Sequence, residues 1–140
     1  QNEQELSLSF DQIFIDAGTA MGAIGLLMGA AQLGRSWHIH IFSMKESPEA
    51  IQKLIARYAA GLKLPPYSIY ELTTAKSFGS VNQKIIAQIN DFAQQEGIFL
   101  DQIYSAKMLY ELSHTRRALL TPQSLIIHSG GALSLSGLEG

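Results

Sequence analysis

The chain of 140 residues contains no cysteine and few charged residues. Without cysteine it can form no disulfide, no thiolate metal site and no cysteine nucleophile, and this is compatible with a cytoplasmic location. Charged residues make up 16% of the chain, well under the roughly 25% usual for soluble domains. We therefore expect part of the surface to be covered by another domain or subunit.

Basic residues are too few for a partner made of nucleic acid. The net charge is −2, and Arg116-Arg117 is the one pair of adjacent basic residues in the chain. A protein that follows a phosphate backbone needs many more basic contacts than this. We therefore expect no nucleic acid among the partners.

Residues 17–34 carry no charge, and a run of 18 such residues is borderline for a membrane-spanning helix. Five glycines interrupt the run, and the apolar part after the first turn is only about 12 residues long, which is too short to cross a bilayer. The first five residues are polar and partly acidic, unlike a secretory signal peptide. We therefore expect a cytoplasmic protein with neither a membrane span nor a signal peptide.

Apolar residues make up 46% of the chain, enough for a buried core, and their pattern alternates between strands and helices. Short apolar runs predict strands over residues 13–16, 37–44, 67–72 and 125–127. Capping residues and glycines predict helices over residues 22–33, 49–60, 80–95 and 102–117. Ser47 and Asp101 are expected to cap the helices over 49–60 and 102–117, and Ser80 is expected to start the helix over 80–95. This alternation is typical of an α/β fold with three layers, in which a parallel sheet joined by right-handed crossovers has helices on both faces.

A glycine-rich turn, Asp16–Gly25, follows the first predicted strand. Such a turn lets the backbone pass close to a phosphate, and the first N–H groups of the following helix then point at the anion. Thr19 adds a hydroxyl. The turn lacks the G-x-G-x-x-G pattern of dinucleotide-binding proteins, because Ala20 stands at the second glycine, and it lacks the Gly-Lys-Ser/Thr of a P-loop. A phosphate ligand is the leading hypothesis, and a tight strand–helix turn without a ligand is the alternative.

A second glycine turn, His128–Gly131, follows the last predicted strand. Parallel strands end at one edge of a sheet, and ligands bind there. The two turns can therefore share one site. Ser129 is not part of a G-x-S-x-G nucleophile elbow, and the alternative is a Ser-Gly turn that simply ends the strand.

Leu100–Met108 brings Tyr104 and Lys107 to the start of a predicted helix. The alternative to a functional role is an N-capped amphipathic helix with Tyr104 half-buried. His38 and His40 lie two residues apart on one face of a strand, a spacing that can bind zinc, but the sequence offers no third ligand. We therefore expect no metal site.

Together the two glycine turns and the Leu100–Met108 segment resemble the C-terminal half of the pyridoxal-phosphate enzymes related to D-cysteine desulfhydrase and 1-aminocyclopropane-1-carboxylate (ACC) deaminase. These enzymes have the tryptophan-synthase-β-like fold, type II. The matching stretches are residues 16–26, 96–108 and 126–131, in the same order and with similar spacing. The resemblance extends over nearly the whole chain.

The resemblance implies roles for particular residues. Tyr104 would line the substrate side of the cofactor ring, and Ser129 would lie against the pyridine nitrogen, where a hydroxyl gives a milder electron sink than a carboxylate. The residues implied to bind the cofactor are Ala17, Gly18, Thr19, Ala20, Met21, Gly22, Ser129 and Gly130. The family usually has glycine and threonine where this chain has Ala20 and Met21, and proline where it has Gln102.

The resemblance also implies that residues 1–140 are the C-terminal, large-domain part of a two-domain enzyme. In the family the Schiff-base lysine lies in the N-terminal half, in an Asn-Lys context that this chain lacks, and Lys107 matches a different lysine. The whole protein would then be a pyridoxal-phosphate-dependent deaminase or lyase acting on a small amino acid, and a homodimer. This chain alone is expected to be inactive. The alternatives are a stand-alone phosphate- or nucleotide-binding module and a catalytically dead relative.

Overall fold

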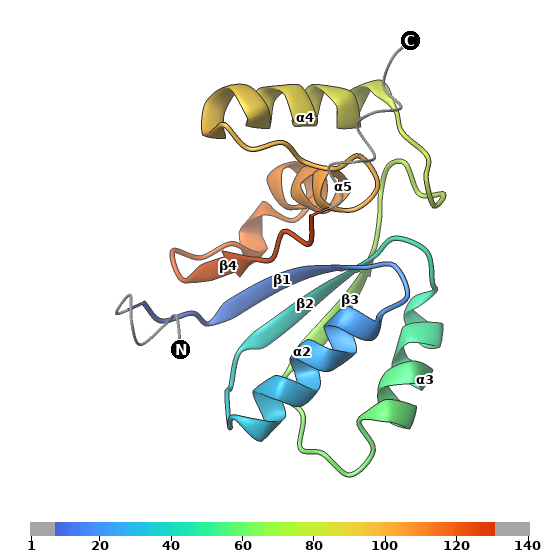
Figure 1. Cartoon of the computed structure of the whole chain (residues 1–140), viewed down its shortest axis with the longest axis vertical. Helices are drawn as coiled ribbons and strands as arrows, with labels where there is room; N and C mark the ends of the chain where they lie inside the picture. Colours follow the sequence, from blue (N-terminus) through green and yellow to red (C-terminus); the bar gives the residue numbers. More distant parts are fainter. Residues whose placement is uncertain (1–7, 131–140) are drawn as a thin grey trace.

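A computed structural model gives the fold of the chain, and it describes residues 8–130. Four parallel strands form one sheet in the order β3-β2-β1-β4 (Figure 1). The strands are β1 (Gln12–Ala17), β2 (His38–Ser43), β3 (Tyr67–Glu71) and β4 (Ser124–Ile126). The α-helices are α2 (Met21–Gln32), α3 (Pro48–Tyr58), α4 (Gln83–Glu96) and α5 (Ser105–Tyr110). The predicted alternation of strands and helices is confirmed.

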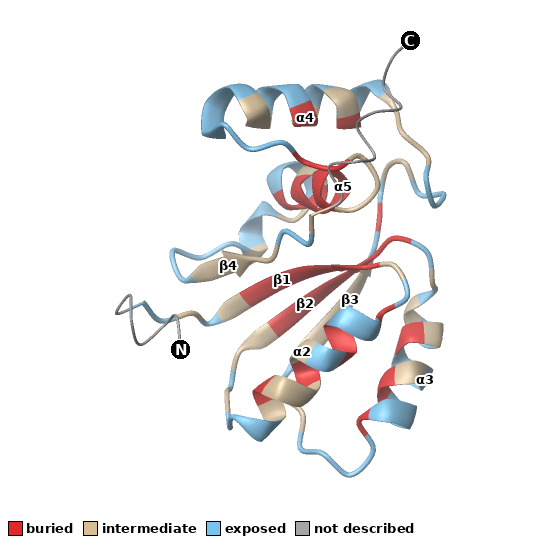
Figure 2. Cartoon of the chain, in the orientation of Figure 1, coloured by how far each residue is buried: buried red, intermediate tan, exposed pale blue. Residues whose placement is uncertain are grey.

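The sheet is the middle of three layers, with α2 and α3 on one face and α4 and α5 on the other (Figure 1). Side chains alternate across β1, so that Ile13 and Ile15 pack in the core with α2 and α3, while Phe14 packs in the core with α4 and α5. Both faces of the central strands are covered, and Figure 2 shows β1 and β2 as largely buried. The predicted α/β fold with helices on both faces is confirmed.

Two helix boundaries differ from the prediction. Helix α4 begins after Asn82, whose side chain accepts a hydrogen bond from the N–H of Ile85 at 3.1 Å. The Ser80 hydroxyl is engaged elsewhere, because it donates to the carbonyl of Ser77 at 2.6 Å. Ser80 therefore belongs to the preceding turn and is not the cap of the helix.

The predicted helix over residues 102–117 is shorter and divided into pieces. Helix α5 passes into a π-helical turn (Glu111–Thr115), and a short 3-10 helix (Arg117–Leu119) follows. In the π turn the N–H of Arg116 bonds the carbonyl of Glu111 at 2.8 Å. The Glu111 side chain is buried and accepts hydrogen bonds from the N–H and hydroxyl of Thr73. This long-range contact ties the start of the π turn to the segment after β3.

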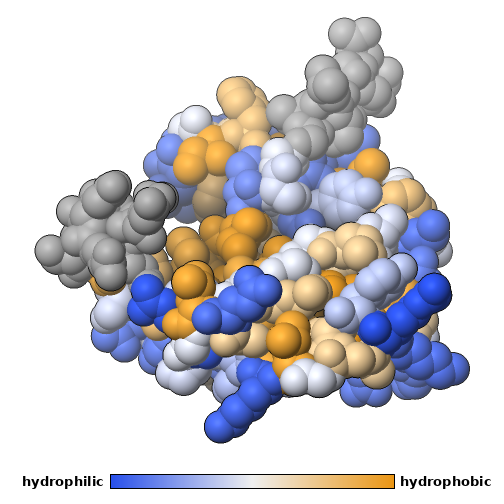
Figure 3. All heavy atoms as spheres, turned by 60° about the horizontal axis from the view of Figure 1, so that its bottom comes forward, coloured by the Kyte–Doolittle hydropathy of each residue, from blue (hydrophilic) through white to orange (hydrophobic). Residues whose placement is uncertain are grey.

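Helix α2 has no charged residue, even on its outer surface, and so accounts for part of the low charged content of the chain. Gly22 and Gly25 are exposed there, and a Cβ atom added at either position would meet no other atom within 4 Å. Figure 3 shows apolar surface interrupted by hydrophilic side chains on the face that carries α2 and α3. Among residues 8–130, no helix is long and apolar enough to cross a membrane. Covering of this surface by another domain or subunit stays a prediction.

Candidate functional site

The two glycine turns lie side by side at the carboxyl edge of the sheet. Strand β1 pairs in parallel with β4, so the segments that follow both strands emerge at the same edge. There the Ser129 hydroxyl donates to the Asp16 carboxylate, at 3.2 Å from each carboxylate oxygen. The prediction that the two turns lie together is confirmed up to Gly130, whereas Gly131 lies outside the described residues.

The first turn ends in a helix start suited to an anion. Ala20 precedes α2 with a φ of 66°, and no side chain caps the helix. The first turn of α2 also contains no acidic residue. Because the first N–H groups of a helix lack partners within it and the dipole favours negative charge, this end can accept a phosphate.

The residues of this turn differ in their exposure. Ala17 is buried at the end of β1, where its carbonyl accepts from the N–H of Met44 at 2.9 Å. Ala20 is buried as well, whereas Thr19, Met21 and Gly22 are exposed. The Thr19 hydroxyl and the start of α2 are therefore accessible to a ligand.

Tyr104 completes the site from the other side of the sheet. A Cβ atom added to Gly18 would lie 3.0 Å from Cε1 and 3.3 Å from the hydroxyl of Tyr104, so the phenol ring lies directly against the turn. Tyr104 is half-buried, and Phe78 packs edge-on to it with ring centroids 6.1 Å apart. All three sequence elements singled out above therefore meet at one place.

Asp101 fixes the backbone that carries Tyr104. One of its carboxylate oxygens accepts from the N–H groups of Ile103 and Tyr104, at 3.0 and 2.6 Å. The other accepts from the N–H of Ser105 at 2.9 Å. Asp101 thus binds the N–H groups that follow it, but the prediction that it caps the helix directly is wrong, because α5 starts only at Ser105 and its N-cap residue is Tyr104. A side chain with this many backbone bonds holds the Tyr104 segment in one conformation.

Burial gives the site an unusual acid. Burial of Asp16, reinforced by the nearby charge of Asp101, raises the pKa of its carboxyl from 3.8 to about 6. The hydrogen bond from Ser129 and the charge of His128 oppose this rise. His128 is itself held, because its Nδ1 lies 2.6 Å from the Ser105 hydroxyl oxygen. Sequence analysis did not single out Asp16, although an acidic residue at the end of a buried strand was a signal for it.

Lys107 takes no part in the site. Its ammonium group is buried and donates to the backbone carbonyls of Ala75 and Ser77, at 2.9 and 3.2 Å. Burial lowers the pKa of Lys107, and the charge of Asp101 opposes this. Lys107 therefore ties the segment after β3 to α5.

The two histidines of β2 are packed in hydrogen bonds and stacked rings. His40 contacts the Gln12 side-chain oxygen at 2.6 Å and the Tyr70 hydroxyl at 3.0 Å, and burial lowers its pKa from 6.5 to about 4. His38 lies 2.8 Å from the Ser68 hydroxyl. Within residues 8–130, no three histidine or acidic side chains are grouped so that they could hold a metal ion.

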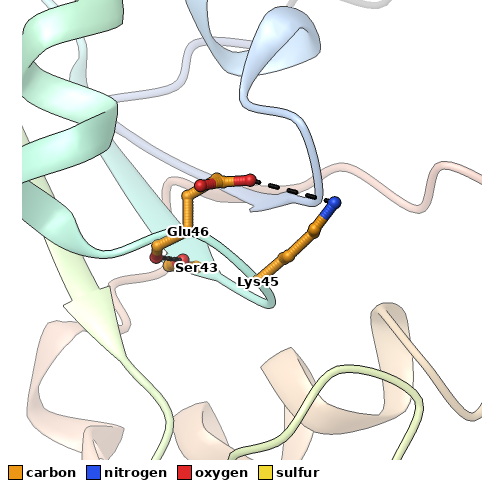
Figure 4. Close-up of polar contacts among 3 residues, drawn as sticks. All are labelled: Ser43, Lys45 and Glu46. Carbon is orange, nitrogen blue, oxygen red and sulfur yellow. Dashed lines mark hydrogen bonds and ion pairs between the residues drawn. The ribbon is translucent and has the colours of Figure 1, made fainter.

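A pocket of about 300 Å³, which sequence analysis missed, lies at the carboxyl ends of β2 and β3. Ser43, Lys45 and Glu46 contribute to its lining (Figure 4). The Ser43 hydroxyl donates to the carbonyl of Glu46, and the Lys45 ammonium lies 4.0 Å from the Glu46 carboxylate. Lys45 is exposed and Glu46 is partly exposed, so this ion pair contributes little to stability.

The fold and the site define an α/β protein with two glycine turns at the carboxyl edge of a parallel sheet. No family model matches the chain. It is 29% identical to D-cysteine desulfhydrase of Serratia proteamaculans strain 568, over 96% of this chain and 44% of the enzyme. It is 28% identical to ACC deaminase of Cyberlindnera saturnus, over 96% of this chain and 42% of that enzyme.

A solved structure agrees with these sequence matches. The crystal structure of an ACC deaminase homologue superimposes with a TM-score of 0.72 at 25% identity, over 89% of this chain and 40% of that protein. The chain therefore resembles the D-cysteine desulfhydrase and ACC deaminase enzymes in sequence and in fold, as the motifs predicted. It spans less than half the length of these relatives.

Proposed function

We propose that this chain is the C-terminal, large-domain part of a pyridoxal-phosphate-dependent enzyme that removes ammonia from a small amino acid and leaves a keto acid. The observation that carries the proposal is the meeting of three elements at one sheet edge. These are the uncapped start of α2, the Ser129 hydroxyl and the Tyr104 ring. The relatives named D-cysteine desulfhydrase and ACC deaminase support the reaction class, with D-cysteine or ACC as the type of substrate.

The residues present fit the cofactor. The N–H groups of residues 18–22 and the Thr19 hydroxyl would hold its phosphate at the uncapped helix start. Ser129, which is exposed, would lie at the ring nitrogen, and Tyr104 would lie on the substrate side of the ring. When bound, pyridoxal phosphate supplies the electron sink that makes a bond at the substrate Cα labile.

The proposed activity needs a Schiff-base lysine from outside this chain. None of its lysines, at positions 45, 53, 63, 76, 84 and 107, follows an asparagine. Lys107, the lysine within the matched segment, is buried against backbone carbonyls. The lysine would therefore come from the N-terminal half, and the missing half would be the principal partner of this chain.

The coding sequence upstream of the Gln1 codon and the activity of the whole protein test the proposal together. We expect an additional domain with a lysine after an asparagine. The whole protein should absorb near the visible edge with pyridoxal phosphate and release ammonia from D-cysteine or ACC. A reading frame without that lysine, or a whole protein that stays colourless with added cofactor, would contradict the proposal.

A stand-alone phosphate- or nucleotide-binding module is the second candidate. The observation in its favour is that the turn after β1 and the start of α2 lie entirely within this chain. This candidate predicts that a nucleotide raises the melting temperature of the 140-residue chain and that pyridoxal phosphate does not. If the chain is part of the proposed enzyme, pyridoxal phosphate should raise the melting temperature and a nucleotide should not.

A further inference from the structure

The Ser129 hydroxyl can donate one hydrogen bond, and in the structure its acceptor is the Asp16 carboxylate. The Ser129 oxygen lies 3.2 Å from both carboxylate oxygens of Asp16. An ionised carboxylate can only accept hydrogen bonds, so the hydroxyl must be the donor. Its two lone pairs remain, and because Ser129 is exposed they are accessible to a ligand.

We propose that Asp16 is a positioning residue that accepts the hydrogen bond of the Ser129 hydroxyl, so that Ser129 offers only lone pairs to a ligand and selects a cofactor whose ring nitrogen carries a proton. This inference rests on the proposed function, because it assumes that Ser129 meets the pyridine nitrogen. It differs from the sequence-based expectation of a milder electron sink. A hydroxyl backed by a carboxylate stabilises a protonated ring, which withdraws electrons more strongly than a neutral one.

The surroundings of Asp16 allow the direction of the hydrogen bond between Asp16 and Ser129 to change with pH. Asp16 is 7% exposed at the end of β1, and the charged groups that act on it are Asp101, beside α5, and His128, after β4. With its pKa raised to about 6 by burial, Asp16 is ionised at pH 8 and gains a proton as the pH falls through 6. Once protonated, Asp16 can itself donate to Ser129. The hydroxyl proton of Ser129 is then free for a neutral ring nitrogen.

The direct test uses 4′-deoxypyridoxine 5′-phosphate labelled with ¹⁵N in the ring, which has the phosphate and ring nitrogen of the cofactor but no aldehyde to react with lysines. Bound to the 140-residue chain at pH 8, its nitrogen should resonate as a protonated pyridine. In Asp16→Asn the negative charge behind Ser129 is lost, and the proton affinity of the ring nitrogen should fall roughly tenfold or more. Asp11→Asn removes a carboxylate just before the opposite end of β1 and should change nothing. A neutral ring in the unmodified chain, or equal results for the Asp11 and Asp16 variants, would overturn the inference.

A second measurement needs no cofactor. The Asp16 carboxyl, followed by ¹³C NMR, should titrate near 6 in the unmodified chain. Ser129→Ala should raise its pKa further, because the hydrogen bond that favours the carboxylate is lost, and Ser129→Thr should keep it. If Ser129→Ala leaves the titration unchanged, the pairing and this inference fail while cofactor binding can persist. If the titration responds but the phosphate ligand does not bind, the proposed function fails, and with it the role of the pairing at a ring nitrogen.

Discussion

The phenol ring of Tyr104 lies against the backbone of Gly18, so close that a Cβ atom there would be 3.0 Å from the ring. Contacts between real Cβ atoms and other heavy atoms essentially never fall below this distance. Gly18, the first glycine of the turn, is therefore needed for packing against Tyr104 as well as for the turn itself. It lets a side chain from the α5 side of the sheet reach the segment that leads into α2.

Substitution of Gly18 by alanine should displace Tyr104. We expect a loss of about 1 to 3 kcal/mol in the free energy of unfolding, as is typical of overpacking, and weaker binding of 4′-deoxypyridoxine 5′-phosphate. Gly25→Ala is the matched control, because a Cβ there meets nothing within 4 Å. Denaturant unfolding and calorimetric titration measure the two effects. If Gly18→Ala and Gly25→Ala behave alike, the contact does not shape the site.

Ala20 carries the left-handed backbone conformation that glycine adopts at little cost, with φ at 66°. Ala20→Gly should therefore stabilise the chain slightly, since a left-handed conformation costs an L-residue roughly 1 to 2 kcal/mol, more than the roughly 0.8 kcal/mol lost with the buried methyl group of Ala20. Ala23→Gly, inside α2, should instead destabilise it, by about 1 kcal/mol from helix propensity and further from the loss of a buried methyl group. Thermal melts distinguish the two signs. A destabilising Ala20→Gly would show that the turn is not strained at this position.

Asp101→Ala should destabilise the chain by about 2 kcal/mol or more, because three backbone N–H groups lose their acceptor. Asp101→Asn keeps one acceptor oxygen and should cost less. Hydrogen exchange at Ile103, Tyr104 and Ser105 provides a local measurement. Faster exchange confined to these amides in both variants is the expected result, and unchanged protection would contradict this role of Asp101.

Asp16 and His40 should give opposite slopes of stability against pH. The folded state raises the pKa of Asp16 from 3.8 to about 6, so its contribution to the free energy of unfolding falls as the pH rises through this window. It lowers the pKa of His40 from 6.5 to about 4, so that contribution rises with pH and is lost as the pH falls towards 4. Each effect is on the order of 2 to 3 kcal/mol.

Two variants separate these contributions. Between pH 4 and 6.5, Asp16→Asn should make stability rise more steeply with pH than in the unmodified chain, and His40→Gln should make it fall more steeply. Asp91→Asn, an exposed position on α4, is the control and should leave the slope unchanged. Denaturant unfolding at several pH values provides the measurement. Equal slopes for the two variants would show that the burial of these groups does not control the pH dependence.

The sequence predicted the parts of the structure that depend on local signals. Ser47 caps α3, Gly97 ends α4 in a left-handed conformation, and Asp101 binds the N–H groups that follow it, each through neighbours a few residues away. The alternation of strands with helices then limited the sheet to a parallel arrangement, which placed both glycine turns at one edge.

Contacts between distant residues explain what the sequence did not predict. Asp16 and Ser129 are 113 positions apart, and no local pattern pairs them. The π turn begins at Glu111, whose side chain binds Thr73, 38 positions away. At α4 the helix starts after Asn82 and not at Ser80, because the Ser80 hydroxyl bonds within its own turn and the Asn82 side chain accepts from the N–H of Ile85.

The most direct test of the cofactor site is an amide ¹H–¹⁵N NMR titration of the labelled 140-residue chain with 4′-deoxypyridoxine 5′-phosphate. The account predicts saturable shifts at residues 18–23, at Tyr104 and at Ser129, with α4 unaffected. Absence of saturable shifts, or shifts centred on the pocket beside Ser43, Lys45 and Glu46, would contradict it.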